Sequence, residues 1–394
     1  MAARRLVALL CLAGLGTGCD FLEWQALRLY LAVNPNLALE DGPRAYVAES
    51  ERLTLVPIVE DLEFPWDLAF PSGSVALVTE KPGRLSRVDL ATGVRTPIGG
   101  VPDVAFVGQG GLLGVELDPA FASNALVYLS YSVASAGETY TTRLCRARLA
   151  GDTLVELEVL LTAEPAVRGT NHFGGALEFD REGALVLAVG ERMLRQYAQD
   201  LGSHLGKILR LRPDGSAPPD NPFVGTPGAR PEIFSWGHRN PQGLALHPAT
   251  GELWASEHGP RGGDEINVIR AGRNYGWPVI SHGEEYEGGR VGVGTHQDGL
   301  EQPVHFYVPS IATAGIGFYT GGALPSWRGN LFVAGLRGTQ LDRLVLEGER
   351  VTHVEPLFRE LWQRVRAVRE SPAGELYVLT ENGVLFRVDP AYAR

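Results

Sequence analysis

Several short segments of the chain combine glycine with histidine, arginine, asparagine or glutamine. Glycine lets the backbone approach a ligand closely, and the polar side chains can bind that ligand or exchange protons with it. Histidine suits proton transfer near neutral pH, because its unperturbed pKa is about 6.5. Such segments, recurring at similar places in successive structural units, indicate one shared site. They are residues 108–114, 171–175, 199–207, 237–243, 257–267 and 274–278.

The segments alternate with a repeat made of a short alternating apolar run, a turn rich in Pro, Asp or Gly, and a second alternating run. Alternation with a period of two residues predicts β-strands, and the turn residues predict tight connections between them. Six units follow one another at intervals of roughly 48–68 residues, the fifth in a looser form. They lie at Trp66–Thr79, Val115–Ser130, Leu177–Val189, Leu244–Ser256, Phe318–Ala334 and Val368–Thr380.

A unit of this size cannot bury both faces of its own sheet, so the units must stack against one another. Six strand-rich units with little helical periodicity predict an all-β fold, a six-bladed β-propeller. A pair of β-sandwiches is the alternative, but that fold does not require a six-fold recurrence. Because propeller loops meet around a central channel, we expect the polar segments to converge at one face.

Charge and cysteine content limit the kinds of partner and site. The 394 residues carry a net charge of −11 and include three cysteines. The acidic balance argues against a nucleic-acid partner, and three cysteines exclude a disulfide scaffold or a cysteine-built zinc cluster. Cys145 falls in an expected strand at 141–149, where we expect it to be a small packing residue.

The N-terminus has the parts of an export signal, with Arg4 and Arg5 before the apolar run Leu6–Leu15. That run is too short to span a bilayer, and no later segment is long and apolar enough. The small residues before Cys19 resemble a bacterial lipobox, which implies lipidation of Cys19; a plain cleaved signal is the alternative. We expect a signal peptide at 1–18, a tether or wrap at 19–45, a propeller at 46–390, and a periplasmic or other extracytoplasmic protein that is membrane-anchored through Cys19.

The ordered set of polar segments resembles the soluble quinoprotein glucose dehydrogenases and aldose sugar dehydrogenases, the glucose/sorbosone dehydrogenase family. The resemblance runs from about Leu53 to Asp389, and the block Glu257–Asn267 favours the aldose branch. It implies a six-bladed propeller that holds pyrroloquinoline quinone (PQQ) and Ca²⁺ and oxidises aldose sugars to lactones. It also implies a respiratory electron acceptor. The sequence has no nicotinamide fingerprint, which agrees with another hydride acceptor.

The resemblance also implies roles near the reacting centre. His172 matches the general base that takes the proton of the anomeric hydroxyl as hydride moves to the quinone. Gln109 matches a residue near quinone and substrate, and Arg239 matches the arginine facing the reactive quinone carbonyl, whose developing charge it would stabilise. Asn240 matches a cofactor contact. Glu191 replaces the usual Asp of a carboxylate that would orient His172, and it is one methylene longer.

A second implied group binds the three carboxylates of PQQ and the metal. Arg337, Arg364 and Arg366 match the cationic residues of the last two blades, and arginine pairs well with carboxylates. His258 stands where the glucose dehydrogenase branch has Gln and would contact the cofactor. The remaining implied residues are the carbonyls of Gly259 and Pro260 as Ca²⁺ ligands with Asp264 nearby, and Glu265 and the Tyr275 carbonyl as ligands of a further structural Ca²⁺.

Two other functions remain open from the residues alone. One is a non-catalytic propeller that binds a glycan or a protein partner. The other is a Ca²⁺-dependent propeller lactonase, which would need several side-chain carboxylates around a metal on the channel axis. The sugar and the choice between monomer and homodimer also remain open.

Overall fold

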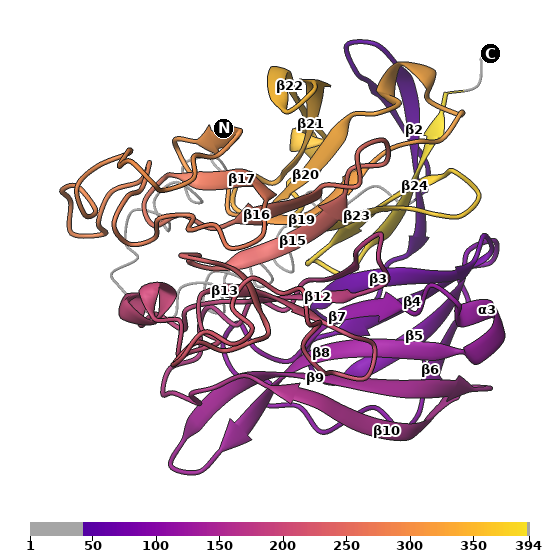
Figure 1. Cartoon of the computed structure of the whole chain (residues 1–394). Coiled ribbons are helices and arrows are strands. Elements are labelled where there is room, and N and C mark those ends of the chain that lie inside the picture. Colours follow the sequence, from indigo (N-terminus) through magenta and orange to yellow (C-terminus); the bar gives the residue numbers. More distant parts are fainter. Residues whose placement is uncertain (1–41, 392–394) are drawn as a thin grey trace. The chain divides into compact units, whose positions relative to one another are not determined.

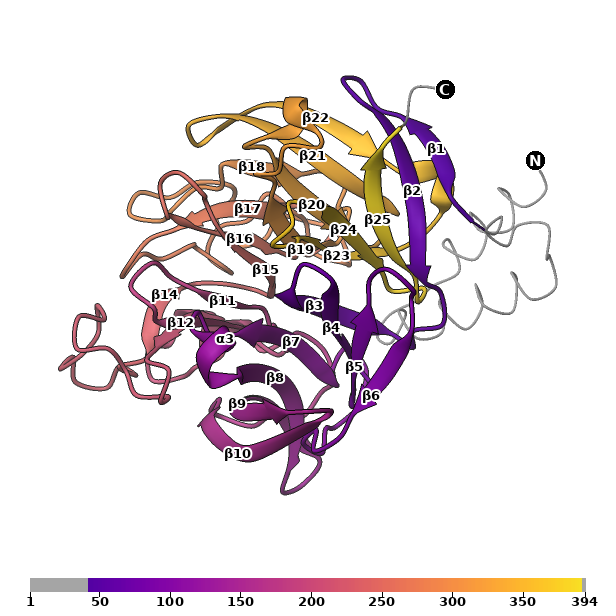
Figure 2. The same cartoon turned by 90° about the vertical axis from the view of Figure 1, so that its right-hand side faces the viewer.

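The computed structural model describes residues 42–391, and six antiparallel sheets account for almost all of its regular structure. The blades follow one another around a centre, which confirms the predicted six-bladed β-propeller (Figures 1 and 2). The expected signal peptide, the Cys19 anchor and residues 19–41 of the expected tether lie outside the described residues. Among residues 42–391, no helix has the length and apolarity to cross a membrane.

The first three blades each contain four consecutive strands in sequence order across the sheet. Blade 1 holds β3 (Pro65–Ser72), β4 (Val75–Glu80), β5 (Arg84–Asp89) and β6 (Arg95–Ile98). Blade 2 holds β7 (Leu112–Leu117), β8 (Leu126–Ser135), β9 (Thr139–Ala150) and β10 (Thr153–Thr162), with the short helix α3 (Phe121–Asn124) after β7. Blade 3 holds β11 (Leu177–Phe179), β12 (Leu185–Val189), β13 (Lys207–Leu211) and β14 (Ile233–Trp236), with the 3₁₀ turn η2 (Arg195–Gln199) before β13.

The last three blades complete the ring. Blade 4 holds β15 (Pro241–Leu246), β16 (Leu253–Glu257), β17 (Asp264–Ile269) and β18 (His305–Tyr307). Blade 5 holds β19 (Thr313–Phe318), β20 (Leu331–Gly335), β21 (Gln340–Glu347) and β22 (Arg350–Leu357), with η3 (Pro325–Trp327) before β20. Blade 6 holds β23 (Val365–Glu370), β24 (Leu376–Thr380) and β25 (Leu385–Pro390), preceded by η4 (Arg359–Leu361) and completed by β2 (Arg52–Val59) and β1 (Arg44–Val47).

The closure of blade 6 joins two distant parts of the chain in one sheet. Strand β2 pairs antiparallel with β25, from Leu53 opposite Pro390 to Val59 opposite Leu385, and β1 pairs with the outer side of β2. The repeat did not predict this closure, because neither β1 nor β2 belongs to any of the six units. Strand β1 begins at Arg44, slightly before the expected start of the propeller at 46.

The six repeated units correspond to the first two strands of the six blades. The first strands of neighbouring blades contact one another in a closed ring, from β3 through β7, β11, β15, β19 and β23 back to β3. The fifth unit was looser because its marked start, Phe318, is the last residue of β19, so the unit began in the turn. The hydrophobic alternation therefore identified the strands nearest the channel.

The core lies in layers between neighbouring blades. Leu144 of blade 2 packs with Leu187 and Leu209 of blade 3, and all five residues of β12 are buried. Each fully buried leucine contributes about 1.5–3 kcal/mol to stability. Cys145 lies in β9, is fully buried in the layer between blades 1 and 2, and carries a free thiol, as its strand position predicted.

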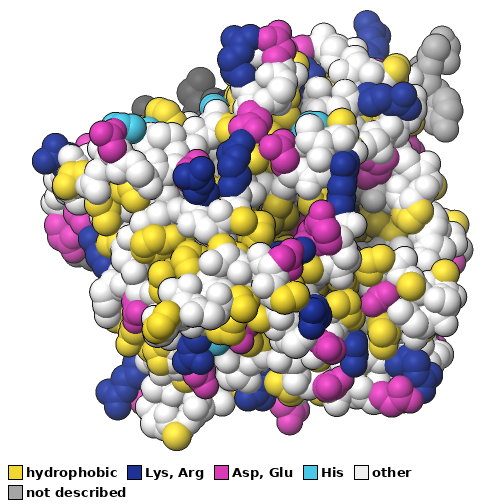
Figure 3. Space-filling model, in the orientation of Figure 1, with side chains coloured by type: hydrophobic (Ala, Val, Ile, Leu, Met, Phe, Trp, Pro, Cys, Tyr) yellow, Lys and Arg dark blue, Asp and Glu magenta, His cyan; other side chains and the backbone are white. Residues whose placement is uncertain are grey.

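Acidic and basic side chains are interspersed on the face drawn in Figure 3. Ion pairs on the molecular surface include Arg84–Glu63 and Arg195–Glu285. Charged groups on this surface therefore have opposite charges close by, even though the chain carries net negative charge.

Candidate active site

The antiparallel order of each blade brings two kinds of loop to one face of the propeller. Successive strands run in opposite directions, so the loop before the first strand and the loop between the second and third strands lie at the same end. Every residue expected at the cofactor site lies on such a loop or at the adjoining end of a strand. Gln109, His172, Arg239, Asn240 and Arg364 precede first strands; Glu191, His258, Gly259, Pro260 and Arg337 lie between second and third strands; Asp264 begins β17, and Arg366 is the second residue of β23.

His172 and Glu191 form a buried hydrogen-bonded pair. The Nδ1 atom of His172 lies 3.0 Å from Oε1 of Glu191, and both side chains are almost completely buried. Since a carboxylate accepts, Nδ1 carries the proton and Nε2 is the basic nitrogen. The Gln109 carbonyl Oε1 accepts the backbone N–H of His172 at 2.9 Å, which holds the turn that presents the imidazole.

The backbone around this pair is unusual. His172 has φ of +56°, and Arg192 and Met193 follow Glu191 with φ of +59° and +60°. Arg192 donates to the carbonyl oxygens of Asn171, Tyr140 and Gly169 at 2.6–2.8 Å, and its guanidinium lies over the Phe173 ring. These bonds stabilise the two turns in conformations that non-glycine residues rarely adopt.

The environment keeps the His172 imidazole neutral. Burial lowers its pKa below the ordinary value, the charges of Arg239 and Arg192 lower it further, and the hydrogen bond to Glu191 acts in the opposite direction. Burial also lowers the pKa of His258 to about 4, with the charge of Asp264 opposing and those of Arg239 and Arg366 assisting. Two uncharged imidazoles therefore share this part of the face near neutral pH.

Arg239 joins the His172 pair to the segment after β16. Its carbonyl oxygen accepts the Glu191 backbone N–H at 2.8 Å, while its Nη1 donates to the carbonyls of His258 at 3.2 Å and Gly259 at 2.6 Å. The neighbouring Asn240 accepts at Oδ1 from the Gly174 backbone N–H at 3.1 Å. Hydrogen bonds thus connect residues named from the sequence into one group, which contains Gln109, His172, Glu191, Arg239, His258 and Gly259.

Buried polar atoms in this group have no hydrogen-bond partner among the described residues. An unpartnered buried polar atom costs about 1–3 kcal/mol, so several in one place indicate that a polar ligand completes them. This arrangement fits a cofactor rich in oxygen and nitrogen atoms. The atoms are Glu191 Oε2, Arg239 Nε, Asn240 Nδ2 and His258 Nε2.

A cluster of cations lies beside Glu381, between β24 and β25. Arg364 Nε contacts Glu381 Oε2 at 2.5 Å, and Arg366 donates from Nη1 to Gln242 Oε1 of blade 4 at 2.8 Å. Burial would raise the pKa of Glu381, but the charges of Arg364, Lys81 and Arg366 lower it to about 2. Arg364 already has a carboxylate partner within the chain, which the sequence analysis did not foresee.

Arg364 and Arg366 are two residues apart but lie in different settings. Arg364 precedes β23, and the pairing of β23 with β24 shifts register between Val365 and Ala367. Arg366 lies over the Trp66 ring of blade 1 at 4.4 Å, towards the channel. Arg337 lies on the same face, exposed in the turn between β20 and β21, and among residues 42–391 no side-chain hydrogen bond or ion pair joins it to the cluster.

Asp264 and Glu265 are adjacent but point to different surroundings. Asp264 accepts from the Gly259 backbone N–H at 3.0 Å and from the Ser310 hydroxyl at 2.7 Å, so it holds the segment that contains Gly259 and Pro260. Glu265 lies opposite Glu257 in the β16–β17 register, and burial together with Glu257 raises its pKa to about 8. Two carboxylates this close together, one buried and one partly buried, suit a bound cation.

Tyr275 lies near this second group. Its ring stacks on His238 with centroids 4.7 Å apart, and His238 Nδ1 lies 3.1 Å from Glu257 Oε2. Within residues 42–391, no group of three or more His, Cys, Asp or Glu side chains is arranged to hold a metal ion. The calcium positions expected at Gly259 and Pro260, and at Glu265 and Tyr275, stay predictions.

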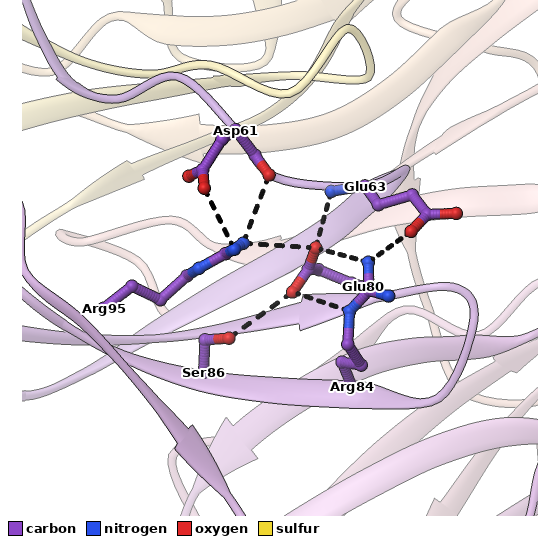
Figure 4. Close-up of polar contacts among 6 residues, drawn as sticks. All are labelled: Asp61, Glu63, Glu80, Arg84, Ser86 and Arg95. Carbon is purple, nitrogen blue, oxygen red and sulfur yellow. Dashed lines mark hydrogen bonds and ion pairs between the residues drawn. The ribbon is translucent and has the colours of Figure 1, made fainter.

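Lys81 is a site residue that the sequence analysis missed. It follows Glu80 in the turn between β4 and β5, and its Nζ donates to the Gly108 carbonyl at 3.2 Å, next to Gln109. Figure 4 shows the network that fixes this turn around the buried Glu80 carboxylate. Glu80 accepts from the Glu63 backbone N–H at 2.5 Å, from Arg84 Nη2 at 3.0 Å and from the Ser86 hydroxyl at 3.4 Å, and it pairs with Arg95, which also pairs with Asp61.

Sequence signals for the missed residues were weak. Lys81 is one of only two lysines in the chain, and Gln242 lies inside the polar segment 237–243, but neither belongs to a recognisable local motif. Glu381 is a single carboxylate in a strand-connecting turn. Lys81 contacts a carbonyl ahead of blade 2 and Gln242 of blade 4 contacts Arg366 of blade 6, so both contacts join different blades, whereas Glu381 contacts Arg364 within blade 6.

Comparisons with known proteins identify the family of this chain. The model of the glucose/sorbosone dehydrogenase family matches residues 62–387. The chain is similar to aldose sugar dehydrogenase YliI of Escherichia coli (strain K12), with 40% identity over 343 residues, covering 85% of this chain and 92% of that protein.

Solved structures give the same result. A crystal structure of a glucose dehydrogenase has a TM-score of 0.83 and 43% identity, covering 86% of this chain and 99% of that chain. The PQQ-bound form of an aldose sugar dehydrogenase from Streptomyces coelicolor has a TM-score of 0.72 and 30% identity, covering 87% and 99%. This chain therefore belongs to the glucose/sorbosone dehydrogenase family.

Proposed function

We propose that this chain is a PQQ-dependent aldose sugar dehydrogenase that oxidises the anomeric carbon of an aldose to the lactone. The observation that carries the proposal is the buried His172–Glu191 pair beside Arg239, where polar atoms of the same group have no partner among the described residues. The solved relative from Streptomyces coelicolor, described as PQQ-bound, supports the choice of cofactor.

His172 acts as the general base in this proposal. Its Nε2 takes the proton of the anomeric hydroxyl while the C1–H bond breaks and the C1–O bond becomes a carbonyl. Glu191 keeps the proton on Nδ1 and stabilises the imidazolium that forms, because a carboxylate hydrogen bond favours the charged ring. When bound, PQQ supplies the two-electron acceptor for the hydride that leaves C1.

The cationic residues hold the cofactor in the same proposal. Arg366, Arg364, Lys81 and the exposed Arg337 offer positive charge for its carboxylates, and Asn240 and His258 offer unpartnered polar atoms. The Gly259 and Pro260 carbonyls would hold Ca²⁺, with Asp264 fixing their segment. Glu265 and the Tyr275 carbonyl would hold a second, structural Ca²⁺.

The place of the enzyme in the cell is part of the proposal. The export signal at 1–18 and the lipobox-like segment before Cys19 support an extracytoplasmic enzyme that is anchored through Cys19 and passes electrons to a respiratory acceptor. Mass spectrometry of the mature N-terminus tests this, since a lipidated Cys19 as the first residue is expected. An unmodified Cys19 in the mature chain would remove the anchor.

Reconstitution tests the activity itself. The purified chain is mixed with PQQ and Ca²⁺, cofactor binding is followed by quenching of tryptophan fluorescence, and reduction of a dye is followed with glucose, xylose and other aldoses. We expect PQQ to bind and the dye to be reduced, and His172→Ala to bind PQQ but lose most of the activity. Absence of PQQ binding refutes the proposal, and glycan binding without turnover would support the non-catalytic alternative.

A further inference from the structure

Two long loops stand together on the active-site face, one from blade 3 and one from blade 4. The first, residues 190–206, connects β12 to β13 and contains Glu191 and the turn η2. The second, residues 270–304, connects β17 to β18 and reaches this face by backbone hydrogen bonds, from Trp277 to the Gly237 carbonyl and between Arg261 and Glu284. The first loop carries the partner of His172, so whatever holds the second loop against it shapes the surroundings of the reacting centre.

Side-chain hydrogen bonds fasten the two loops at their base. Gln199 Nε2 donates to Asn274 Oδ1 at 3.0 Å, and Asn274 Nδ2 donates back to Gln199 Oε1 at 2.9 Å. Gln199 Nε2 also donates to the Trp277 carbonyl at 2.7 Å. Ala198, Trp277 and Val291 form a small hydrophobic cluster beneath them, separate from the cores between the blades.

A bidentate ion pair fastens the same loops nearer their tips. Arg195 Nη1 and Nη2 lie 2.6 Å and 2.9 Å from the two carboxylate oxygens of Glu285, the two-point geometry that arginine and carboxylate favour. The guanidinium groups of Arg195 and Arg239 each lie 5.3 Å from the centre of the Trp277 ring. We call this pair, Arg195 and Glu285, the clasp.

The segment that follows the clasp is an ordered turn. Glu285 donates its backbone N–H to the Gly289 carbonyl at 2.9 Å, and Gly288 donates back to the Glu285 carbonyl at 2.9 Å. Glu284 and Arg261 exchange backbone hydrogen bonds at 3.0 Å and 3.1 Å, which ties the turn to the segment directly after Gly259 and Pro260. The position of Tyr286, at the start of this turn, is therefore set by contacts on both sides.

Tyr286 contacts the site through one atom and exposes the rest of its side chain. Arg239 Nη2 donates to the Tyr286 hydroxyl oxygen at 3.3 Å, yet 60% of the tyrosine is exposed. Because a guanidinium can only donate, the phenolic oxygen accepts here and its own O–H remains available to donate. Tyr286 therefore offers a solvent-exposed aromatic ring and an O–H donor, and its hydroxyl is hydrogen-bonded to Arg239. These features suit a sugar, which combines apolar C–H faces with hydroxyl groups that accept hydrogen bonds.

We infer that Tyr286 is a substrate-recognition residue that stacks on the aldose ring and donates a hydrogen bond to one of its oxygens, and that the clasp is the positioning device that holds it there. The inference rests on the proposed function and extends it to the wall of the sugar site. Tyr286 contributes chiefly to binding, since it contacts Arg239 and neither His172 nor Glu191 in the described structure. Its loss therefore raises KM more than it lowers kcat.

The test compares Tyr286→Phe and Tyr286→Ala with the wild-type full chain, reconstituted with PQQ and Ca²⁺ and assayed with glucose and xylose. Removing the hydroxyl should raise KM by about 3- to 10-fold, the range for one lost neutral hydrogen bond. Removing the ring should raise KM by at least about 10-fold, with kcat changed by no more than about 3-fold. Val293→Ala, which shortens another exposed apolar side chain of the same loop, is the matched control and should leave KM unchanged.

The PQQ dissociation constant, from tryptophan quenching, separates sugar recognition from cofactor binding. An unchanged PQQ constant with a raised KM in Tyr286→Ala supports the inference. An unchanged KM, or a loss confined to PQQ binding, overturns it. If the wild-type chain oxidises no aldose, the proposed function fails, and saturation-transfer NMR with glucose still tests Tyr286: loss of transfer in Tyr286→Ala supports recognition, whereas equal transfer overturns it.

Exchanging the charges of Arg195 and Glu285 tests the positioning role of the clasp. Glu285→Arg should raise KM towards the Tyr286→Ala value, because two arginines repel each other where the clasp should close. The double variant Arg195→Glu, Glu285→Arg restores opposite charges and should recover most of the wild-type KM at unchanged kcat. Recovery supports a positioning role, and equal KM values in the wild type and the single variant overturn it.

Discussion

Glu191→Gln is the most informative change at the reacting centre, because it removes a charge and keeps the side-chain shape. Glu191 Oε1 lies 3.0 Å from Nδ1 of His172 in a buried setting, and Oε2 has no partner among the described residues. A glutamine carbonyl can still accept from Nδ1, so the imidazole should keep its orientation. The variant therefore isolates the electrostatic contribution of the carboxylate.

The expected loss of activity follows from replacing a hydrogen bond to a charged carboxylate with one to a neutral amide. A hydrogen bond to a charged group contributes about 1.5–3 kcal/mol, against about 0.5–1.5 kcal/mol between neutral groups. The imidazolium that forms in the reaction thus loses about 1–2 kcal/mol of stabilisation, and kcat/KM should fall about 5- to 30-fold.

The pH dependence gives a second, directional result. Burial and the Arg239 charge lower the pKa of His172 while Glu191 raises it, so the low-pH limb of activity in the wild type should lie below the ordinary histidine value of about 6.5. Removing the Glu191 charge lowers the pKa further. The limb should therefore move to lower pH while the plateau falls.

The assay is kcat/KM from about pH 5 to about pH 9 with saturating PQQ and Ca²⁺. Glu191→Asp is the control, since its shorter side chain keeps the charge but leaves the 3.0 Å contact out of reach, and an intermediate plateau is expected. A wild-type plateau in Glu191→Gln, or a limb that moves to higher pH, would refute the role given to the pair.

Other changes test the network around the site. Glu381→Gln should lower the free energy of unfolding at pH 7, measured in urea, by about 3 kcal/mol, because buried cations lose their carboxylate. The stability advantage of the wild type is complete above the unfolded pKa of about 4.3 and should disappear as the pH falls towards the folded pKa of about 2. A loss of stability at low pH equal to that at pH 7 contradicts this prediction. Glu80→Ala should cost about 2–3 kcal/mol because its hydrogen-bond donors lose a buried acceptor, whereas Glu63→Ala, at an exposed ion pair, should change stability by less than about 1 kcal/mol; similar losses would contradict the ranking. Cys145→Ser should cost about 1–3 kcal/mol in urea denaturation because it buries a hydroxyl, with Cys145→Ala milder, and the reverse order would show that the thiol is not a packing group.

The sequence pattern predicted the inner parts of the fold well. The apolar alternation around Leu177 and Leu185 is local, and strands next to the channel are buried between blades, so their pattern is strong. The loops could also be placed on one face, because antiparallel order alone decides which loops share an end. The positions of His172 and Arg239 follow from that rule.

Contacts made across the ring could not be predicted from local patterns. Arg366 of blade 6 reaches Gln242 of blade 4 over a distance that only the closed ring sets. The clasp between Arg195 and Glu285 joins two irregular loops without periodicity. Strand β2 was missed because it lies outside the six units and its inner partner, β25, is at the other end of the described chain.

The pairing of β2 with β25 also has a consequence for synthesis of the protein. Blades 1 to 5 are each built from consecutive segments, so their strand pairs can form while the chain is being made. The ring can close only after residues 385–390 have emerged, because they supply the partner of β2. A polypeptide interrupted within blade 6 would leave β2 as an exposed edge strand, which favours aggregation and proteolysis. Only chains that have been translated through β25 can therefore pair both edges of β2 and close the ring.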